Sequence, residues 1–153
     1  MDNEVKKLFE NDLKEYAETD KNSAWDFDHE GILAAIILCS SMPRMMYRGK
    51  AKAYDYDEKA ITLAKQVVKE GQFDNYKKQE KCSIIIAIAN SESIEDTDTA
   101  MRLADKTGDE IMSHANDQNH LIDAFGRFPD RNRVLGRTST GEEKSYLYAV
   151  AQN

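Results

Sequence analysis

The organisation of this chain is decided by residues 125–140, which read Phe125-Gly-Arg-Phe-Pro-Asp-Arg-Asn-Arg-Val-Leu-Gly-Arg-Thr-Ser-Thr140. The stretch cannot form one helix, because Pro129 has no amide donor and its ring would clash with the preceding turn. It is not a flexible linker either, since its two phenylalanines, Val134 and Leu135 favour burial. The sequence therefore predicts an ordered, irregular segment that holds four arginines in place, and ordered loops commonly carry function.

Length and composition limit the kind of protein this can be. The chain has 153 residues, of which 41% are hydrophobic and 32% are charged, so we expect one folded domain over residues 1–153. A formal net charge of −7 argues against a nucleic-acid partner, because phosphate contacts need a basic surface. The sequence shows no secretory signal and no apolar run of about 20 residues. We therefore expect an intracellular, soluble, cytoplasmic protein.

The two cysteines, Cys39 and Cys82, both lie in apolar runs and share no spacing typical of a metal site. Their surroundings favour buried thiols in a reducing compartment, with a disulfide as the alternative. The three histidines do not form a metal-binding pattern either, because His114 and His120 are six residues apart on one expected helix and so face different ways. We expect no metal and no cofactor.

Apolar residues recur at helical spacing along most of the chain, which predicts an all-α fold of about seven helices. The isoleucine-rich stretch 82–88 would also suit a strand, but no partner strand is evident elsewhere. Short connections make neighbouring helices antiparallel, so the chain is expected to stack as helical hairpins. The expected helices cover residues 3–18, 28 to about 42, 57–70, about 77–90, 93 to about 106, about 109–124, and a short stretch after 140.

Residues with known end preferences mark several helix boundaries. Asp28 and Asp57 are expected as N-caps, and Gly71 is expected just after a helix, in a left-handed conformation. Pro43 is expected to end or bend its helix and to be followed by a turn over 44–49.

Other boundary signals are less direct. Trp25 and Phe27 are expected to cap the helix that follows them. Two sequences are typical of capping boxes, namely Ser93-Ile-Glu-Asp96, with Asp in place of Glu, and Thr140-Gly-Glu-Glu143.

Several blocks of the chain resemble the bacterial family called domain of unknown function 924. The resemblance covers nearly the whole chain and implies an all-helical, tetratricopeptide-like fold, but it implies no activity because the family has none established. The matching residues are the 125–140 stretch with Glu143 and Leu147 beyond it; Pro43-Arg44, Tyr47-Arg48-Gly49, Ala53, Asp57 and Ala60; Ser91-Glu92, Ile94 and Asp96; and Trp25 and Leu33.

The chain departs from the family pattern at residues that could titrate or bind a metal. Ser40-Ser41-Met42 stands where the family usually has Asp-Gln before its Phe-Pro-Arg. Positions where the family has histidine are Asn90, Gln118 and Asp130 here. The chain also starts late relative to the family, without a segment that normally precedes it.

Six arginines lie in the expected irregular segments, and they allow two interpretations. Planar guanidinium groups bind carboxylates or phosphates through paired hydrogen bonds, so the loops could form an anion pocket, for example between Arg48 and Arg131. Alternatively, the arginines tie the loops to buried carbonyls and to carboxylates such as Glu92, Asp96 or Asp57. We expect mostly structural ties, with one or two arginines exposed. The six are Arg44, Arg48, Arg127, Arg131, Arg133 and Arg137.

Two other groups of residues also allow more than one interpretation. Ser91 and Glu92 could serve as nucleophile and acid/base with Asn90 as an orienting group, but a catalytic serine needs a base, and a helix cap is the simpler interpretation. Three methionines, Met42, Met45 and Met46, could form an adaptable contact surface or pack in the core under Pro43.

The sequence therefore leaves two classes of function. The first is a non-enzymatic helical binding or assembly module with a protein partner. The alternative is an enzyme or binder of a small anionic ligand at the arginine-rich loops, and the lost histidines favour the first. Whether a reaction is catalysed is left open. The candidate ligand-binding residues are Arg44, Arg48, Ser91, Glu92, Arg127, Arg131 and Arg137.

Overall fold

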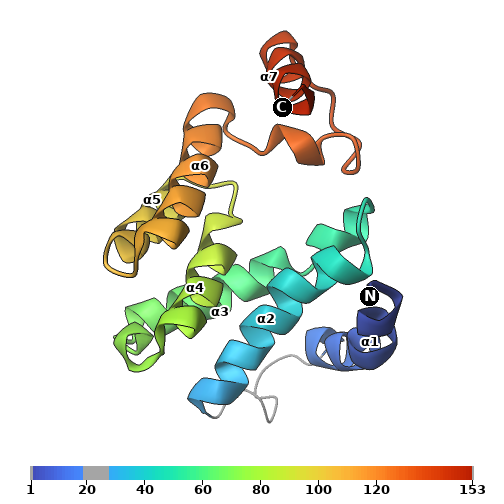
Figure 1. The fold of residues 1–153 in the computed structure, drawn as a ribbon. Helices are drawn as coiled ribbons and strands as arrows, with labels where there is room; N and C mark the ends of the chain where they lie inside the picture. Colours follow the sequence, from blue (N-terminus) through green and yellow to red (C-terminus); the bar gives the residue numbers. More distant parts are fainter. Residues whose placement is uncertain (1, 19–27, 153) are drawn as a thin grey trace.

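The computed structural model describes residues 2–18 and 28–152 (Figure 1). These residues form seven α-helices and no strand, which confirms the predicted all-α fold. Trp25 and Phe27 lie outside the described residues. The α-helices are α1 (Asp2–Glu18), α2 (His29–Met46), α3 (Asp57–Lys69), α4 (Lys78–Ala89), α5 (Ile94–Asp105), α6 (Asp109–Phe125) and α7 (Gly141–Ala151), and the 3₁₀ helices are η2 (Ala51–Tyr54), η3 (Phe73–Asn75) and η4 (Pro129–Arg131).

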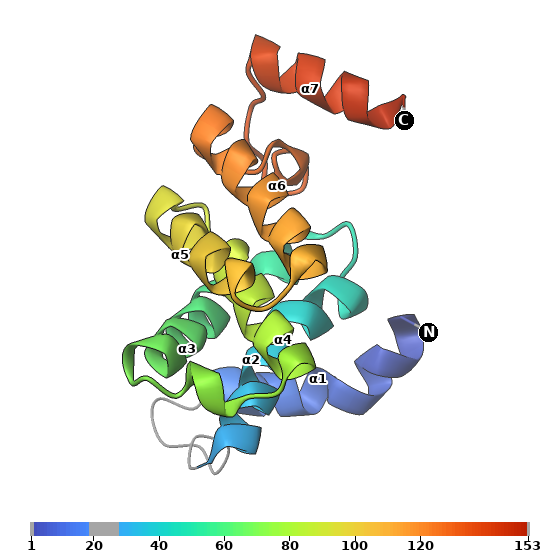
Figure 2. The same ribbon diagram turned by 60° about the vertical axis from the view of Figure 1, so that its left-hand side comes forward.

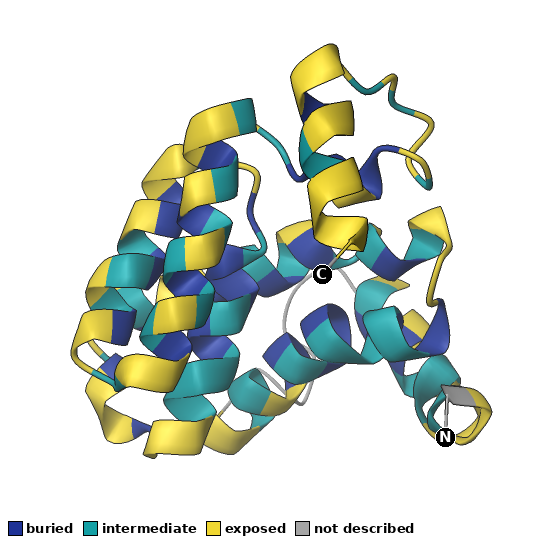
Figure 3. Ribbon diagram, turned by 45° about the horizontal axis from the view of Figure 1, so that its top comes forward, coloured by how far each residue is buried: buried dark blue, intermediate teal, exposed yellow. Residues whose placement is uncertain are grey.

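Consecutive helices pack on one another, α1 on α2, α2 on α3, α4 on α5 and α5 on α6. Helix α4 also contacts α2, α3 and α6, so it lies at the centre of the bundle (Figures 1 and 2). Its isoleucines Ile84, Ile85 and Ile88 are fully buried, which explains a helix that is apolar on most sides. The choice of helix over strand for this stretch is confirmed. Figure 3 shows exposed residues along the outer faces of the helices and buried ones between them.

Helix α2 runs through Pro43 to Met46, so of the two expected outcomes, an end or a bend at Pro43, the end is wrong. Proline removes one helical hydrogen bond, but the flanking bonds persist: Tyr47 N donates to the Pro43 carbonyl at 2.8 Å. The Arg44 side chain donates to the Ser40 carbonyl at 2.8 Å and thereby supports the same turn. Pro43 is itself fully buried, and burial favours keeping this turn in the core. The turn begins only at Tyr47.

Two of the predicted caps are wrong because the carboxylate expected to cap the helix binds another donor. Tyr56 is the N-cap of α3, and Asp57 is its first helical residue, with a carboxylate that binds Arg44. Ser93 is the N-cap of α5 as expected, but its side chain makes no capping bond. The Asp96 carboxylate instead accepts a hydrogen bond from Ser91 Oγ at 2.7 Å. In both cases a nearby donor outside the helix start attracts the carboxylate.

The caps that depend on local geometry are confirmed. Asp28 accepts from Gly31 N at 2.7 Å at the start of α2. Gly71 follows α3 with φ of +70°, a conformation that favours glycine. Thr140 N donates to Glu143 Oε2 at 2.8 Å and Glu143 N donates to Thr140 Oγ1 at 3.2 Å, which completes the predicted capping box of α7.

The irregular segment between α6 and α7 begins at Gly126, whose φ of +69° ends α6. Phe128 follows and is 1% exposed, as expected for an anchor. Phe125 is half-buried and its ring lies 5.4 Å from that of Tyr146 in α7. Leu135 is 36% exposed, so the expectation that it is buried is wrong. The segment places α7 at one end of the molecule, beyond α6 (Figures 1 and 2).

Across the described residues, no helix combines the length and the apolar character needed to cross a bilayer.

Replacing Phe128 with alanine should lower the free energy of unfolding by about 3–5 kcal/mol, because a large, fully buried ring is lost and a cavity remains. The measurement is urea unfolding followed by circular dichroism. Leu135→Ala, in the same segment but exposed, is the control and should cost less than about 1 kcal/mol. Equal unfolding midpoints for wild type and Phe128→Ala would show that the segment is not anchored by this ring.

Candidate functional site

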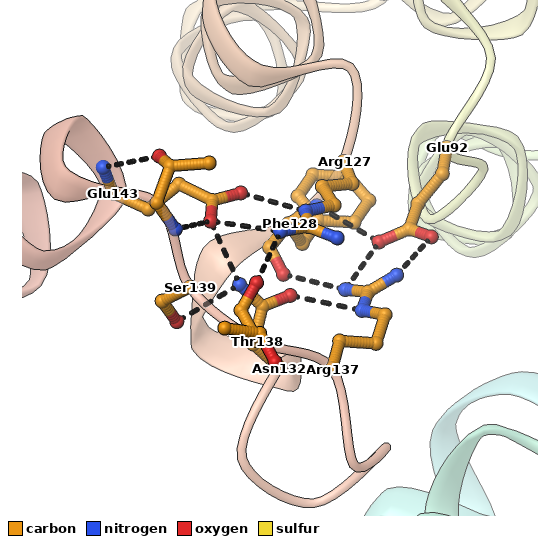
Figure 4. Close-up of polar contacts among 9 residues, drawn as sticks. Glu92, Arg127, Phe128, Asn132, Arg137, Thr138, Ser139 and Glu143 are labelled. Atoms are coloured by element: carbon orange, nitrogen blue, oxygen red, sulfur yellow. Dashed lines mark hydrogen bonds and ion pairs between the residues drawn. The ribbon is translucent and has the colours of Figure 1, made fainter.

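Glu92, in the connection between α4 and α5, fixes the irregular segment (Figure 4). Its carboxylate accepts two hydrogen bonds from the Arg137 guanidinium, at 2.7 and 3.0 Å, and one from Phe128 N at 2.8 Å. Arg137 also donates to the Phe128 carbonyl at 2.9 Å and to Asn132 Oδ1 at 2.8 Å. Burial alone would raise the pKa of Glu92, but the bonds from Arg137 and Phe128 N outweigh it and hold that pKa below its usual value.

Glu143, the capping residue of α7, makes a second tie to the same segment (Figure 4). Arg127 donates to its two carboxylate oxygens at 2.7 and 2.9 Å, and Asn132 Nδ2 donates at 3.1 Å. Glu143 is 2% exposed, and the hydrogen bonds from Arg127 and the Thr140 amide lower its pKa to about 2. A charge this buried is tolerated because the carboxylate is paired with Arg127 and accepts four hydrogen bonds in all.

Asp57 makes a third tie, shared between two arginines. Arg44 binds it through two hydrogen bonds of 2.6 and 2.8 Å. Arg131, from η4, reaches Asp57 Oδ2 at 3.5 Å. Asp57 therefore joins the end of α2, the start of α3 and η4.

Arg131 differs from the other tied arginines. Its residue is 7% exposed, and its guanidinium carbon lies 4.1 Å from the Phe128 ring centroid and 4.8 Å from that of Tyr54. Burial lowers its pKa, although an arginine stays charged at neutral pH. Within the described part of the chain, the long bond to Asp57 is the only hydrogen bond of its side chain. Arginine has five N–H donors, so most of them have no protein acceptor here.

Two hollows meet at Arg131. We name the first the α3 groove; it has a volume of about 1260 Å³ and lies between one face of α3 and the α4–α5 connection. We name the second the arginine pocket; it has a volume of about 520 Å³ and lies between the end of α2, α6, η4 and α7. Tyr54, Asn90 and Arg131 line both hollows. Other residues lining the arginine pocket include Arg44, Arg48, His114, Gln118, Leu121, Phe128, Asp130, Tyr146, Leu147 and Val150.

The structure thus divides the candidate residues into two sets. Three arginines, Arg44, Arg127 and Arg137, bind carboxylates through paired hydrogen bonds. Arg48 is exposed and lines the arginine pocket with Arg44 and Arg131. Arg127 and Arg137 line neither hollow.

Ser91 and Glu92 line the α3 groove, on the other side of Arg131 from Arg48. Ser91 Oγ donates to Asp96, whose other oxygen lies 2.5 Å from Lys65 Nζ. Asp96 thus pairs with Lys65 and not with an arginine. The Glu92 carboxylate is bound by Arg137, so Ser91 and Glu92 both make structural contacts. Among the described contacts, Ser91 has no histidine partner.

The three positions where the family resemblance implies histidine come together. Asn90, Gln118 and Asp130 all line the arginine pocket, although they lie on three different elements. His114 also lines it, and burial lowers the pKa of this histidine. No group of three His, Cys, Asp or Glu side chains that could hold a metal ion occurs among the residues described.

Sequence reasoning missed several residues that shape the site. Asn132 is 1% exposed and links Glu143, Ser139 and Arg137, but asparagine in an arginine-rich loop gives no signal of burial. Tyr54 stacks on Arg44 and Arg131 at 5.2 and 4.8 Å. Tyr54 lies three positions before Asp57, and this aromatic residue near an expected arginine partner could have indicated that it stacks on an arginine.

Comparison with known proteins gives a family and one similar structure. Residues 1–150 match the family described as "Bacterial protein of unknown function (DUF924)". The solved structure of a protein of unknown function, ATU0120 from Agrobacterium tumefaciens, is 28% identical, with a TM-score of 0.87 over 95% of this chain and 82% of that one. No curated protein sequence matches the chain.

The buried Glu143 carboxylate should make the free energy of unfolding depend on pH in the acid range. Its pKa is about 2 in the folded protein against 4.5 when unperturbed. A lowered folded pKa stabilises the fold above pH 4.5, and this contribution is lost as the pH falls from 4.5 towards 2. Glu143→Gln should therefore be less stable at pH 7 and lose part of the acid dependence, measured as urea midpoints at pH 7, 4 and 3. Glu142→Gln, its exposed neighbour, is the control. Parallel pH profiles for wild type and Glu143→Gln would contradict the tie.

Proposed function

We propose that this chain, which belongs to the DUF924 family, is a binding protein whose arginine pocket holds a small anionic ligand. The observation that carries the proposal is the incomplete pairing of Arg131. Burying a charge is costly unless it is paired and hydrogen-bonded. The other three tied arginines meet this requirement, whereas Arg131 donates a single hydrogen bond of 3.5 Å to the described residues.

The unused donors of Arg131 reach a surface. Within the described residues, only His114 Nε2 is a fully buried side-chain nitrogen or oxygen without a hydrogen-bond partner. The remaining N–H groups of Arg131 are therefore not sealed in the protein, and this residue lines both hollows. An anion in either hollow could accept from them.

The charges that line the two hollows favour one of them as the anion site. The α3 groove is lined by six carboxylates against Lys65, Lys69 and Arg131, which disfavours an anion. The arginine pocket is lined by Arg44, Arg48 and Arg131 and by one carboxylate, Asp130, while Asp57 pairs with Arg44 and Arg131 from outside the lining. Its volume also lies within the range of small-molecule sites, roughly 300–1,000 Å³. The charge and the volume therefore support the arginine pocket as the anion site.

Binding is favoured over catalysis. The two lining positions Asn90 and Gln118 carry amides, which do not titrate. Ser91 lies in the other hollow and donates to Asp96. Covalent acyl or phosphoryl transfer needs a nucleophile beside a general base, and no hydrogen bond between two such lining side chains is found among the described contacts of the arginine pocket.

A second candidate function is docking of a protein segment in the α3 groove. One continuous face of α3 lines it at helical spacing, through Glu58, Ile61, Thr62, Lys65, Gln66 and Lys69. This would be the assembly role, with the helical bundle as a platform. A protein partner whose affinity for the Lys65→Ala and Thr62→Ala variants equals its affinity for the wild type would argue against this surface.

Phosphate or acetate should raise the melting temperature more than sodium chloride at the same ionic strength, because a ligand that binds only the folded state stabilises it by RT ln(1 + [L]/Kd), about 2.7 kcal/mol at a hundredfold excess over Kd. Arg131→Gln should remove this response and remain folded. Arg133→Gln, an exposed arginine of the same segment that lines neither hollow, should keep it.

Differential scanning fluorimetry of the three proteins provides the measurement. The proposal would be contradicted if the anions raise the melting temperature of Arg131→Gln as much as that of the wild type, or raise neither more than chloride does.

A further inference from the structure

We propose that the ligand of the arginine pocket is a small polyhydroxylated anion, in which a phosphate or carboxylate group is attached to a polyol or a sugar. This inference rests on the proposed function and narrows the ligand to a chemical class. It follows from the carboxamide and phenol side chains that line the pocket together with Arg131 and have no hydrogen-bond partner among the described residues.

Two carboxamides and two phenols line the arginine pocket. They come from four elements: Tyr54 from η2, Asn90 from the C-cap of α4, Gln118 from α6 and Tyr146 from α7. All four residues are partly buried. None of their amide or hydroxyl groups makes a hydrogen bond to another described residue. The pocket therefore presents neutral hydrogen-bonding groups that the described fold does not use.

Carboxamides that are buried elsewhere in the fold are paired. Asn119 donates to Thr97 Oγ1 at 3.1 Å and to Asp98 Oδ1 at 2.8 Å. Asn132, which is 1% exposed, makes three hydrogen bonds. Pairing is expected there, because a buried polar group without a partner costs free energy. The carboxamides of the arginine pocket differ: they have no protein partner, and their polar atoms are not sealed from solvent.

Two of these side chains lie in the part of the pocket that contains Arg131. Tyr54 and Asn90 line both hollows, as Arg131 does, so the three residues share the boundary between them. The Tyr54 ring centroid is also 4.8 Å from the guanidinium carbon of Arg131. An anionic group bound by Arg131 would therefore bring the neighbouring atoms of its ligand close to Asn90.

The chemistry of these side chains favours ligand hydroxyl groups. A carboxamide offers N–H donors and a carbonyl acceptor, and a phenol can donate and accept. A bare anion only accepts, so it leaves the carboxamide oxygens without a donor, and an alkyl chain pairs with neither. An ammonium group would donate, but it would place another positive charge near Arg131, which is repulsive. A hydroxyl group both donates and accepts, and it is neutral.

The test is a calorimetric titration of the full chain with two series of anions. The phosphate series is methyl phosphate, glycerol 3-phosphate and glucose 6-phosphate, and the carboxylate series is acetate, glycerate and gluconate. One net hydrogen bond is worth roughly a fivefold gain in affinity. We expect Kd to fall by at least about this factor at the first step of a series and to fall again at the second. The tighter series identifies the anionic group. Sorbitol, a neutral polyol, should not bind measurably.

Variants separate the two parts of the ligand. Gln118→Met and, independently, Asn90→Leu remove a carboxamide and keep a side chain of similar size. Each should reduce the ratio of Kd between the member without hydroxyls and the polyhydroxylated members. Arg131→Gln should weaken every member of a series by a similar factor. Gln72→Met is the matched control, because Gln72 is also partly buried but lines neither hollow, and it should keep the wild-type ratio.

The outcomes are distinguishable. A gain from hydroxyl groups that is reduced in Gln118→Met or Asn90→Leu, but not in Gln72→Met, supports the inference. Binding of methyl phosphate or acetate with no gain from hydroxyl groups would overturn the polyhydroxylated ligand and leave the anion site intact. A gain that neither carboxamide variant reduces would also overturn it, because the hydroxyl groups would then bind elsewhere. Binding of sorbitol as tight as that of the anions, or failure of every anion to bind, would remove the proposed function itself.

Discussion

The carboxylate of Glu92 is the contact on which the rest of the site depends. The segment between α6 and α7 has little regular backbone pairing of its own, so its position is set by side chains from elsewhere. Glu92 binds the Phe128 amide and the Arg137 guanidinium at once, and Arg137 returns a bond to the Phe128 carbonyl. Phe128 is thereby held in place, and its ring in turn supports the guanidinium of Arg131. Both hollows take part of their wall from this arrangement.

The arginines of this chain have two physical roles. Arg127 and Arg137 each bind a carboxylate through paired bonds and also donate to backbone or side-chain oxygens of the same segment, which is the geometry of a structural tie. Arg131 is more deeply buried than either, yet it has poorer hydrogen bonding and relies on two aromatic faces. Stacking on aromatic rings compensates part of the cost of burial and leaves the donors available. A charge maintained in this way is better suited to a ligand than to stability.

Local signals in the sequence were sufficient for much of the fold. The capping box at Thr140–Glu143 and the glycine after α3 are predictable because both depend on residues within a few positions. Asp57 was assigned wrongly because its partners are 13 and 74 residues away, a distance that no capping rule considers. The arginine-rich loops could be recognised as a candidate site, but the arginines that are tied and the one that is underpaired can be told apart only in the structure. That Leu121 and Leu147 line the arginine pocket was unpredictable for the same reason, since helical periodicity alone assigns such residues to the core.

The central claim, that Arg131 is kept for a ligand while Arg137 is a structural tie, is tested most directly by comparing the free energies of unfolding of Arg131→Met and Arg137→Met without ligand. Removing Arg137 leaves Glu92 partly buried and without its cation, so this variant should lose about 3 kcal/mol or more. Arg131→Met keeps apolar contact with both rings, and Asp57 keeps Arg44, so it should lose less than about 1 kcal/mol or gain stability. Equal losses for the two variants would show that Arg131 is a structural tie as well, and would contradict this account.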